Sequence, residues 1–366
     1  MNKFDDLLLG AVSEGIFPGA CYGVWSNCKL TTGAVGNHTY EKTSPRVNLT
    51  TLWDLASLSK VVATTTATMI LVESGQLDLD HPVALVLPEF AQNGKEHITF
   101  RNLMIHDSGL VAFRPYHLSL DSEERVIDTI YKEKLIYETG TQTVYSDLSM
   151  ILVAKAIEQI TNSKLDDYVK TKLFTPLGMN QTGYFRHGKA TSIRPMVRNN
   201  CAPTEAIEPW RTALRHKRYG EDGALELFGK EPHYIQGEVH DPTATVLDGV
   251  AGHAGLFSTI EDLCLFMISF MTNSQKLINS EVFNMFTTRQ STKSTRALGW
   301  DTKSVEGSSA GSTFGSKSFG HTGYTGTSVW CDPEAHKFSI LLTNRVHPTS
   351  KNTKILGFRA KFNEQT

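Results

Sequence analysis

Ser57 and Lys60 are the residues whose types and spacing most clearly indicate chemistry. They stand in Ser57-Leu58-Ser59-Lys60, which opens an apolar run from Val61 to Glu73 that ends at Gly75. Residues three apart share one face of a helix, so Lys60 can reach the Ser57 hydroxyl. A serine attacks a carbonyl only when a neighbour accepts its proton, and a partly desolvated lysine is one such neighbour. The pair predicts a serine hydrolase without a Ser-His-Asp triad. The alternative is that Ser57 is only the N-cap of the helix and Lys60 a solvated helix residue.

Two other stretches repeat catalytic patterns in unsuitable surroundings. Ser26-Asn27-Cys28-Lys29 also has the Ser-x-x-Lys spacing, but it lies between two short β-prone runs and predicts a hairpin turn. Residues three apart on a strand point to opposite faces, so we expect no cooperation between Ser26 and Lys29.

Gly307-Ser308-Ser309-Ala310-Gly311 fits the pattern Gly-x-Ser-x-Gly. A nucleophile elbow needs a strand before this pattern and a helix after it, but Ser and Gly residues surround it here. We expect a loop there.

Tyr145 is a candidate for proton transfer. Tyr145-Ser146-Asp147 precedes an apolar helical run from Leu148 to Thr161. A tyrosine beside a lysine ammonium loses its proton more readily and can serve as a base or a relay. The plainer alternative is a packed tyrosine followed by Asp147 as a helix N-cap, and the two roles are compatible.

His321-Thr322-Gly323 lies in the β-prone C-terminal part of the chain. A glycine at a strand edge lets a substrate backbone approach closely, so His321 and Thr322 could hold substrate groups. The amide of Tyr324 could join the amide of Ser57 in an oxyanion hole, where one lost donor typically costs about 3 kcal/mol. Taken alone, the stretch fits an ordinary strand histidine better.

Four residues could suggest a metal site: His106, His240, Asp241 and His253. Their spacing matches neither His-Glu-x-x-His nor His-x-His-x-Asp. We therefore expect structural roles in turns and loops, no metal and no cofactor.

Composition excludes several classes of function. The 366 residues carry a formal net charge of -2 and 20% charged residues, so no electrostatic footprint for nucleic acid or an anionic membrane is present. No apolar run is long enough to span a membrane, and the N-terminus does not resemble a secretory signal. The five cysteines are scattered. These features predict a reduced, cytoplasmic protein.

The predicted elements indicate an α/β (α+β) fold. Strands are expected near both chain ends and helices between them, which favours a central antiparallel sheet flanked by helices, with a mainly helical insertion. We expect the sheet domain to comprise residues 1–90 and 250–366 and the insertion residues 91–249, with a long irregular excursion at 180–247. Expected helices run from Phe4 to Glu14, Thr99 to Ile105, Ser122 to Lys134, Leu148 to Thr161, Leu165 to Leu173, Thr259 to Thr272 and Lys351 to Phe362.

The motifs taken together, and in this order, resemble the serine β-lactamase and penicillin-binding-protein superfamily, most closely its class C and family VIII carboxylesterase branch. The resemblance covers nearly the whole chain. Other family-like stretches are Phe17-Pro18-Gly19-Ala20, Asp54-Leu55-Ala56, Ile105-His106-Asp107-Ser108-Gly109-Leu110, Pro176-Leu177-Gly178-Met179, Ala251-Gly252-His253-Ala254-Gly255-Leu256-Phe257-Ser258-Thr259 and Leu342-Thr343-Asn344-Arg345.

The resemblance implies a β-lactamase/transpeptidase-like fold with a cleft between two lobes. It implies Ser57 as the acylated nucleophile, Lys60 with Tyr145 as the proton-transfer pair, and His321-Thr322-Gly323 as the family's third motif. Asp147 departs from the asparagine of many β-lactamases and cannot donate a hydrogen bond when ionised. His321 replaces a frequent lysine and can be neutral at pH 7. Both departures weaken the case for a β-lactamase.

The leading hypothesis is a cofactor-free serine carboxylesterase that acts on a small ester or amide through a Ser57 acyl-enzyme. The first alternative is a D-alanyl-D-alanine-type peptidase or weak β-lactamase on the same fold. The second is a non-catalytic ligand-binding protein, which the presence of Ser57, Lys60, Tyr145 and His321 disfavours.

Overall fold

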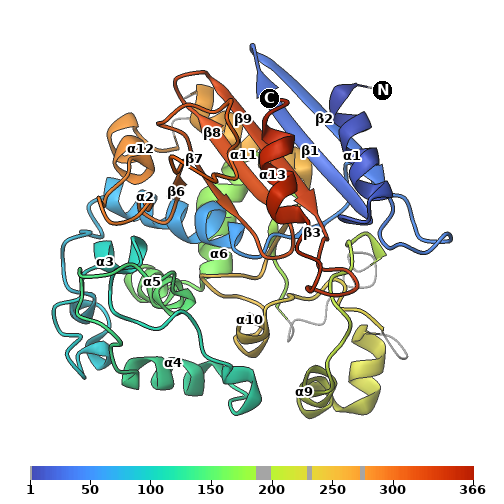
Figure 1. Ribbon diagram of the computed structural model, residues 1–366. Coiled ribbons are helices and arrows are strands. Elements are labelled where there is room, and N and C mark those ends of the chain that lie inside the picture. Colours follow the sequence, from blue (N-terminus) through green and yellow to red (C-terminus); the bar gives the residue numbers. More distant parts are fainter. Residues whose placement is uncertain (1, 187–198, 229–232, 273–276) are drawn as a thin grey trace.

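A six-stranded antiparallel sheet, in the order β2-β1-β9-β8-β7-β6, occupies the upper part of the molecule in the view of Figure 1. The computed structural model describes residues 2–186, 199–228, 233–272 and 277–366. The strands are β1 (Gly19–Ser26), β2 (Lys29–Gly36), β6 (Asp301–Thr302), β7 (Phe319–Thr322), β8 (Ser328–Asp332) and β9 (Lys337–Thr343). The N-terminal strand β1 pairs with the C-terminal strand β9, with Ala20 opposite Thr343. The predicted sheet built from both ends of the chain is therefore confirmed.

Helices cover both faces of this sheet. On one face α1 (Lys3–Ser13) and α13 (Ile355–Asn363) pack together in a cluster that includes Phe4, Leu8 and Phe358. On the other face α11 (Ile260–Thr272) packs against β1 and β9. Figure 1 shows α1 and α13 side by side across the sheet, close to both termini.

A second, three-stranded sheet joins distant parts of the chain. Its order is β3 (Trp53–Asp54), β5 (Leu256–Ser258) and β4 (Gly183–Tyr184). Trp53 pairs with Ser258 and Asp54 with Phe257. This sheet brings the stretch before Ser57 next to the stretch that contains His253.

The Ser57 helix begins with an irregular turn. Lys60–Thr65 is a π-helical segment that continues into α2 (Thr66–Glu73), and Gly75 follows with a φ of 70°. The sequence predicts the helix and its end but not the π segment. Such segments are short and frequently lie at functional sites.

Most of the remaining helices lie, in the sequence, between the N-terminal and the C-terminal strands of the sheet. Among them, α5 (Asp147–Thr161) packs against the Ser57 helix. Ser146, not Asp147, is the N-cap of α5, and its hydroxyl accepts from Ser149 N. The others are α3 (Phe100–Met104), α4 (Glu123–Lys132), α6 (Leu165–Val169), the π segment Lys170–Phe174, α7 (Thr175–Leu177), α9 (Pro209–Phe228), α10 (Pro242–Val246) and α12 (Ser280–Thr287). Within the described residues, no helix is both long and apolar enough to cross a membrane.

Two details differ from the expectations, and a third agrees with them. The excursion at 180–247 contains the 20-residue helix α9, which is kinked at Gly220; residues 187–198 and 229–232 of that excursion lie outside the described residues. Ser26 and Lys29 form the hairpin turn as predicted, but they lie directly opposite each other in the register, so the argument that they point to opposite faces was wrong. Ser309 lies in a loop as predicted and accepts a hydrogen bond from Trp330 Nε1.

Candidate active site

Ser57 follows a strained turn that several polar contacts hold in place. Ala56 has a φ of 47°, a left-handed conformation that costs a non-glycine residue about 1 kcal/mol. Asp54 Oδ1 accepts from Ala56 N at 2.8 Å, and Thr325 Oγ1 donates to Asp54 O at 2.8 Å. The turn is therefore tied to the loop after β7, and Ser57 is presented at the start of its helix.

Lys60 is completely buried and contacts three oxygens. Its Nζ lies 3.0 Å from Ser57 Oγ, 2.9 Å from His253 O and 2.8 Å from Asp147 Oδ1. The contact with Ser57 is the one that the sequence spacing predicts. Burial alone would lower the pKa of the Lys60 ammonium, but Asp147, with a contribution from Tyr145, outweighs burial and raises it. Lys60 is therefore charged at rest, which differs from the expected desolvated lysine that is ready to accept a proton.

Tyr145 lies among positive and aromatic side chains. Lys60 Nζ and Arg296 Cζ each lie 4.9 Å from the centroid of its ring. The rings of His106 and His321 lie 4.7 and 5.9 Å away. The Tyr145 hydroxyl is buried and makes no short hydrogen bond among the described residues, but it interacts with the Lys60 ammonium and helps to raise the pKa of that lysine.

His321 is a buried, neutral side chain at the end of β7. Its Nδ1 donates to Thr322 O at 2.9 Å, which leaves Nε2 as a buried acceptor without a partner among the described residues. Burial, followed by the charges of Arg296 and Lys60, holds the pKa of His321 well below its ordinary value of 6.5. A neutral imidazole cannot replace a lysine as an anchor for a substrate carboxylate.

Gly323 is required by the protein's own packing. A Cβ at this position would lie 2.1 Å from Thr327 Oγ1 and 2.6 Å from Leu55 O. The backbone that approaches Gly323 in the structure is that of the turn before Ser57, and its predicted role in admitting a substrate backbone stays a prediction. Arg359 Nη2 donates to Gly323 O at 2.7 Å and fixes this contact further.

The amides of Ser57 and Tyr324 are both free to donate. Neither N–H makes a hydrogen bond within the part of the chain that the structure describes. Arg345 Nε holds Tyr324 O at 2.8 Å, and the half-exposed Tyr324 ring stacks on His240 at 5.6 Å. Two unused donors beside a nucleophile are what an oxyanion hole requires.

Asp241 and His253 join this group, although the sequence suggested only anchoring roles for them. His253 Nε2 lies 2.9 Å from Asp241 Oδ1, and one polar atom each of Asp147, Asp241 and His253 lie within 4.8 Å of one another. Although burial opposes it, His253 lowers the pKa of the Asp241 carboxyl well below its usual value. A Cβ at Gly252 would lie 2.1 Å from Met150 O, so the glycine permits the close approach to α5 that places His253 here. The only sequence signal was the family-like stretch 251–259.

A cavity of about 670 Å³ opens directly on Ser57. Tyr145, Asp147, Asp241, His253 and Tyr324 border it, whereas His321, Thr322 and Gly323 do not. Of the predicted site, the structure therefore brings Ser57, Lys60, Tyr145 and Asp147 into one cluster and places His321 behind Tyr145, away from the cavity.

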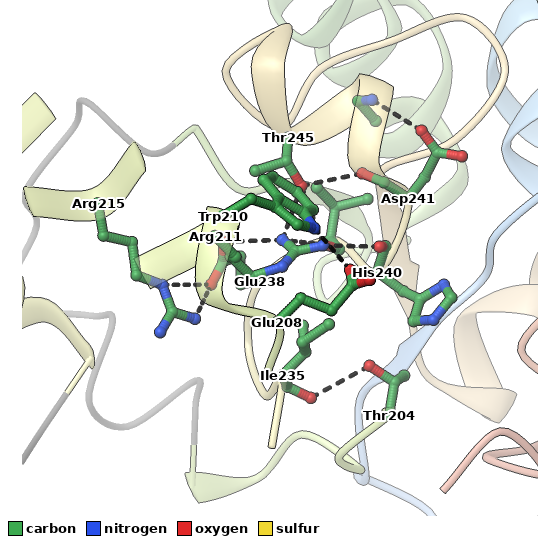
Figure 2. A network of polar contacts seen from close by, with 12 residues as sticks. Thr204, Glu208, Trp210, Arg211, Arg215, Ile235, Glu238, His240, Asp241 and Thr245 are labelled. Atoms are coloured by element: carbon green, nitrogen blue, oxygen red, sulfur yellow. Dashed lines mark hydrogen bonds and ion pairs between the residues drawn. The ribbon is translucent and has the colours of Figure 1, made fainter. Parts of the chain in front are cut away.

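The outer wall of the cavity depends on a buried ion cluster from the excursion (Figure 2). Arg211 Nη1 donates to Glu238 Oε1, Val239 O and Thr245 Oγ1, and its Nη2 donates to His240 O at 2.8 Å. Glu238 also pairs with Arg215. The cluster fixes the segment that carries His240 and Asp241, and the sequence did not reveal it.

Comparison with known proteins agrees with this geometry. The beta-lactamase family model matches residues 4–363. An N-acetylmuramyl-L-alanine amidase of Bacillus subtilis (strain 168) is 31% identical over 95% of this chain and 81% of its own. A putative D-alanyl-D-alanine carboxypeptidase of Salmonella typhi is 30% identical over 85% of this chain and 73% of its own.

Solved structures share the fold. A class C beta lactamase has a TM-score of 0.73 at 18% identity and covers 99% of this chain and 97% of its own. EstCE1, a hydrolase with promiscuous acyltransferase activity, has a TM-score of 0.71 at 19% identity and covers 98% of this chain and 97% of its own. The predicted β-lactamase/transpeptidase-like fold is thus confirmed, and the chain belongs to the beta-lactamase family of serine hydrolases.

Proposed function

We propose that this protein hydrolyses carboxylic esters through an acyl-enzyme on Ser57. The observation that carries the proposal is the contact of Ser57 Oγ with Lys60 Nζ at 3.0 Å on the floor of an open cavity. Ser57 attacks the ester carbonyl, and the amides of Ser57 and Tyr324 stabilise the oxyanion. The alcohol leaves with a proton, and water then releases the acid and restores Ser57.

Proton transfer is assigned to Tyr145 together with Lys60. Asp147 keeps Lys60 positively charged, so the lysine cannot accept the Ser57 proton at rest. The hydroxyl of Tyr145, whose ring lies 4.9 Å from the Lys60 ammonium, is therefore assigned as the proton acceptor. Tyr145 then returns the proton to the leaving alcohol and later activates water.

The test is hydrolysis of p-nitrophenyl butyrate by wild type and Ser57→Ala, with folding checked by circular dichroism. We expect turnover by the wild type and none by the folded variant, which should also lose labelling by a fluorophosphonate. Equal turnover by both proteins would overturn the mechanism.

Amide hydrolysis is the second candidate, because the relatives at 30–31% identity bear the names of an amidase and a carboxypeptidase. The same acyl-enzyme serves both reactions, but an amine leaves only when a proton donor assists it. Release of D-alanine from a D-alanyl-D-alanine peptide, measured beside ester turnover, separates the candidates. Faster turnover of the peptide would make it the principal substrate class.

A further inference from the structure

The two amides of the proposed oxyanion hole belong to segments that are far apart in the sequence. Ser57 follows the nucleophile turn (residues 54–56), and Tyr324 lies in the oxyanion loop (residues 323–327) after β7. Two donors stabilise an oxyanion only when both lie about 2.7–3.1 Å from it. The strength of the hole therefore depends on how the nucleophile turn and the oxyanion loop are joined.

Two buried threonine hydroxyls join the oxyanion loop to the nucleophile turn. Thr325 Oγ1 donates to Asp54 O at 2.8 Å, and Thr327 Oγ1 donates to Leu55 O at 2.9 Å. Thr325 is 1% exposed and Thr327 0%, so both bonds lie in the protein interior, where hydrogen bonds are stronger than in water. The acceptors are the carbonyls of two successive residues just before Ser57. Each bond thus ties the chain beside the Tyr324 amide to the chain beside the nucleophile.

Each of the two joined segments is also held by its own contacts. In the oxyanion loop, Gly323 N donates to Thr327 O at 2.8 Å, and Arg359 Nη2 donates to both Gly323 O and Thr327 O. In the nucleophile turn, Asp54 Oδ1 accepts from Ala56 N at 2.8 Å. The bonds between the two segments, more than bending within either one, therefore determine where one amide lies relative to the other.

A third connection runs from the nucleophile turn to Tyr324 through His240. Asp54 Oδ2 accepts from His240 N at 2.6 Å, and the centroids of the His240 and Tyr324 rings lie 5.6 Å apart in a stacked pair. Asp54 is thus connected to Tyr324 through its carboxylate and, by way of Thr325, through its carbonyl. Of these contacts, the threonine bonds are the ones that a variant can remove without changing a charge or a residue that borders the cavity.

We propose that Thr325 and Thr327 are positioning residues for the oxyanion hole, and that their hydroxyls set the separation of the Ser57 and Tyr324 amides. The proposal rests on the Ser57 acyl-enzyme proposed above, because the oxyanion forms only when Ser57 attacks a carbonyl. Neither threonine borders the cavity, so both act through the main chain and not by touching the substrate. A purely structural role would lower stability and leave the rate of the folded protein unchanged.

The variants that test the proposal remove one hydroxyl at a time. Thr325→Val and Thr327→Val keep the branched shape of the side chain and lose the donor, whereas Thr325→Ser and Thr327→Ser keep the donor. With p-nitrophenyl butyrate, each valine variant should lower kcat by about ten- to a hundredfold, because a misplacement of about 1 Å costs up to about 10²-fold. KM should change little, since acylation and deacylation both pass through an oxyanion. Each serine variant should keep a kcat close to that of the wild type.

A transition-state analogue reports on the oxyanion hole directly. 1-Propylboronic acid resembles the butyryl group and forms a tetrahedral adduct with a serine hydroxyl, in which a boron-bound oxygen takes the place of the oxyanion. Its inhibition constant should rise in each valine variant by about the factor by which kcat/KM falls. Labelling with a fluorophosphonate, carried to completion, counts the folded active sites, so that unfolded protein does not enter kcat.

Thr68→Val is the matched control. Thr68 is completely buried, and its hydroxyl donates to Thr64 O at 2.9 Å within the Ser57 helix. Its loss should leave kcat and the inhibition constant unchanged. A wild-type kcat in either valine variant, an equal loss in Thr68→Val, serine variants as slow as the valine variants, or a lower kcat with an unchanged inhibition constant would each overturn the proposal. A wild type without turnover would contradict the acyl-enzyme itself, and this proposal with it.

Discussion

Asp147 fixes the charge of Lys60, and its replacement tests which group accepts the serine proton. Without the carboxylate, burial becomes the dominant influence and the pKa of Lys60 falls. If the ammonium is the active form, the alkaline limb of the kcat/KM profile should move to lower pH in Asp147→Asn. A profile with the same alkaline limb would show that the charge of Lys60 does not limit the reaction.

Tyr145 offers a direct test of the proton path because Tyr145→Phe removes only the hydroxyl that lies beside Lys60. Tyr145→Phe should lower kcat/KM by about two to four orders of magnitude, the range of general acid–base catalysis. Circular dichroism and the melting temperature should show that the variant is still folded, so that the loss of rate reports the missing hydroxyl. A rate near that of the wild type would remove Tyr145 from the proton path.

Individual residues of the candidate site were predictable where their relation is local or where a motif repeats the order of a known family. Ser57 and Lys60 are three residues apart on one helix, so their contact follows from helical geometry. The Asp147–Lys60 ion pair joins two different helices, and the Asp241–His253 pair joins two loops. Their distances depend on how those elements pack, which no local spacing encodes.

At the scale of elements, the helices that the sequence predicted well carry their own end signals. Ser122 caps α4 and Thr99 caps α3 with a capping box to Asn102. Helix α9 lacks such regularity because Gly220, with a φ of 71°, interrupts its pattern midway. The helix is held by tertiary contacts such as those of Arg211, so its existence was missed although its amphipathic halves are present in the sequence.

Those contacts predict the effect of a mutation on α9. Arg211→Met removes one partner of a buried ion cluster and should lower the free energy of unfolding by about 3–5 kcal/mol. Because Arg211 holds the backbone of His240, the cavity wall should loosen and KM for the ester should rise more than kcat falls. Urea unfolding and steady-state kinetics measure the two effects.

Lys217→Met is the matched control on the same helix. Lys217 pairs with Asp121 at the surface, where such pairs contribute about 1 kcal/mol or less. Arg211→Lys should restore part of the stability, because it keeps the charge but not the forked donors. Equal effects of Arg211→Met and Lys217→Met would mean that the buried cluster does not support the cavity wall.

The whole molecule should lose stability in mild acid because it folds around neutral histidines. Burial, together with Arg296 and Lys60, holds the pKa values of His106 and His321 well below 6.5. Below pH 6.5 the unfolded chain binds protons at these residues and the folded chain does not, so stability falls as pH decreases. Each such histidine contributes a slope of about 1.4 kcal/mol per pH unit. This loss of stability begins at a higher pH than the loss of charge of Glu205. Burial would raise the pKa of Glu205, but His240 and Ser350 lower it to about 2.

Comparing the stability of wild type and a His106 variant separates the effect of this histidine from that of the other titrating groups. His106 has a φ of 60° and its Nδ1 accepts from Ser146 N at 3.1 Å, and asparagine tolerates that conformation and offers an equivalent oxygen. Urea midpoints of wild type and His106→Asn, taken from pH 8 to pH 5, should converge as pH falls, because only the wild type must exclude a proton at this position. Parallel curves would contradict a neutral His106 in the fold, since a side chain with an ordinary pKa creates no such difference.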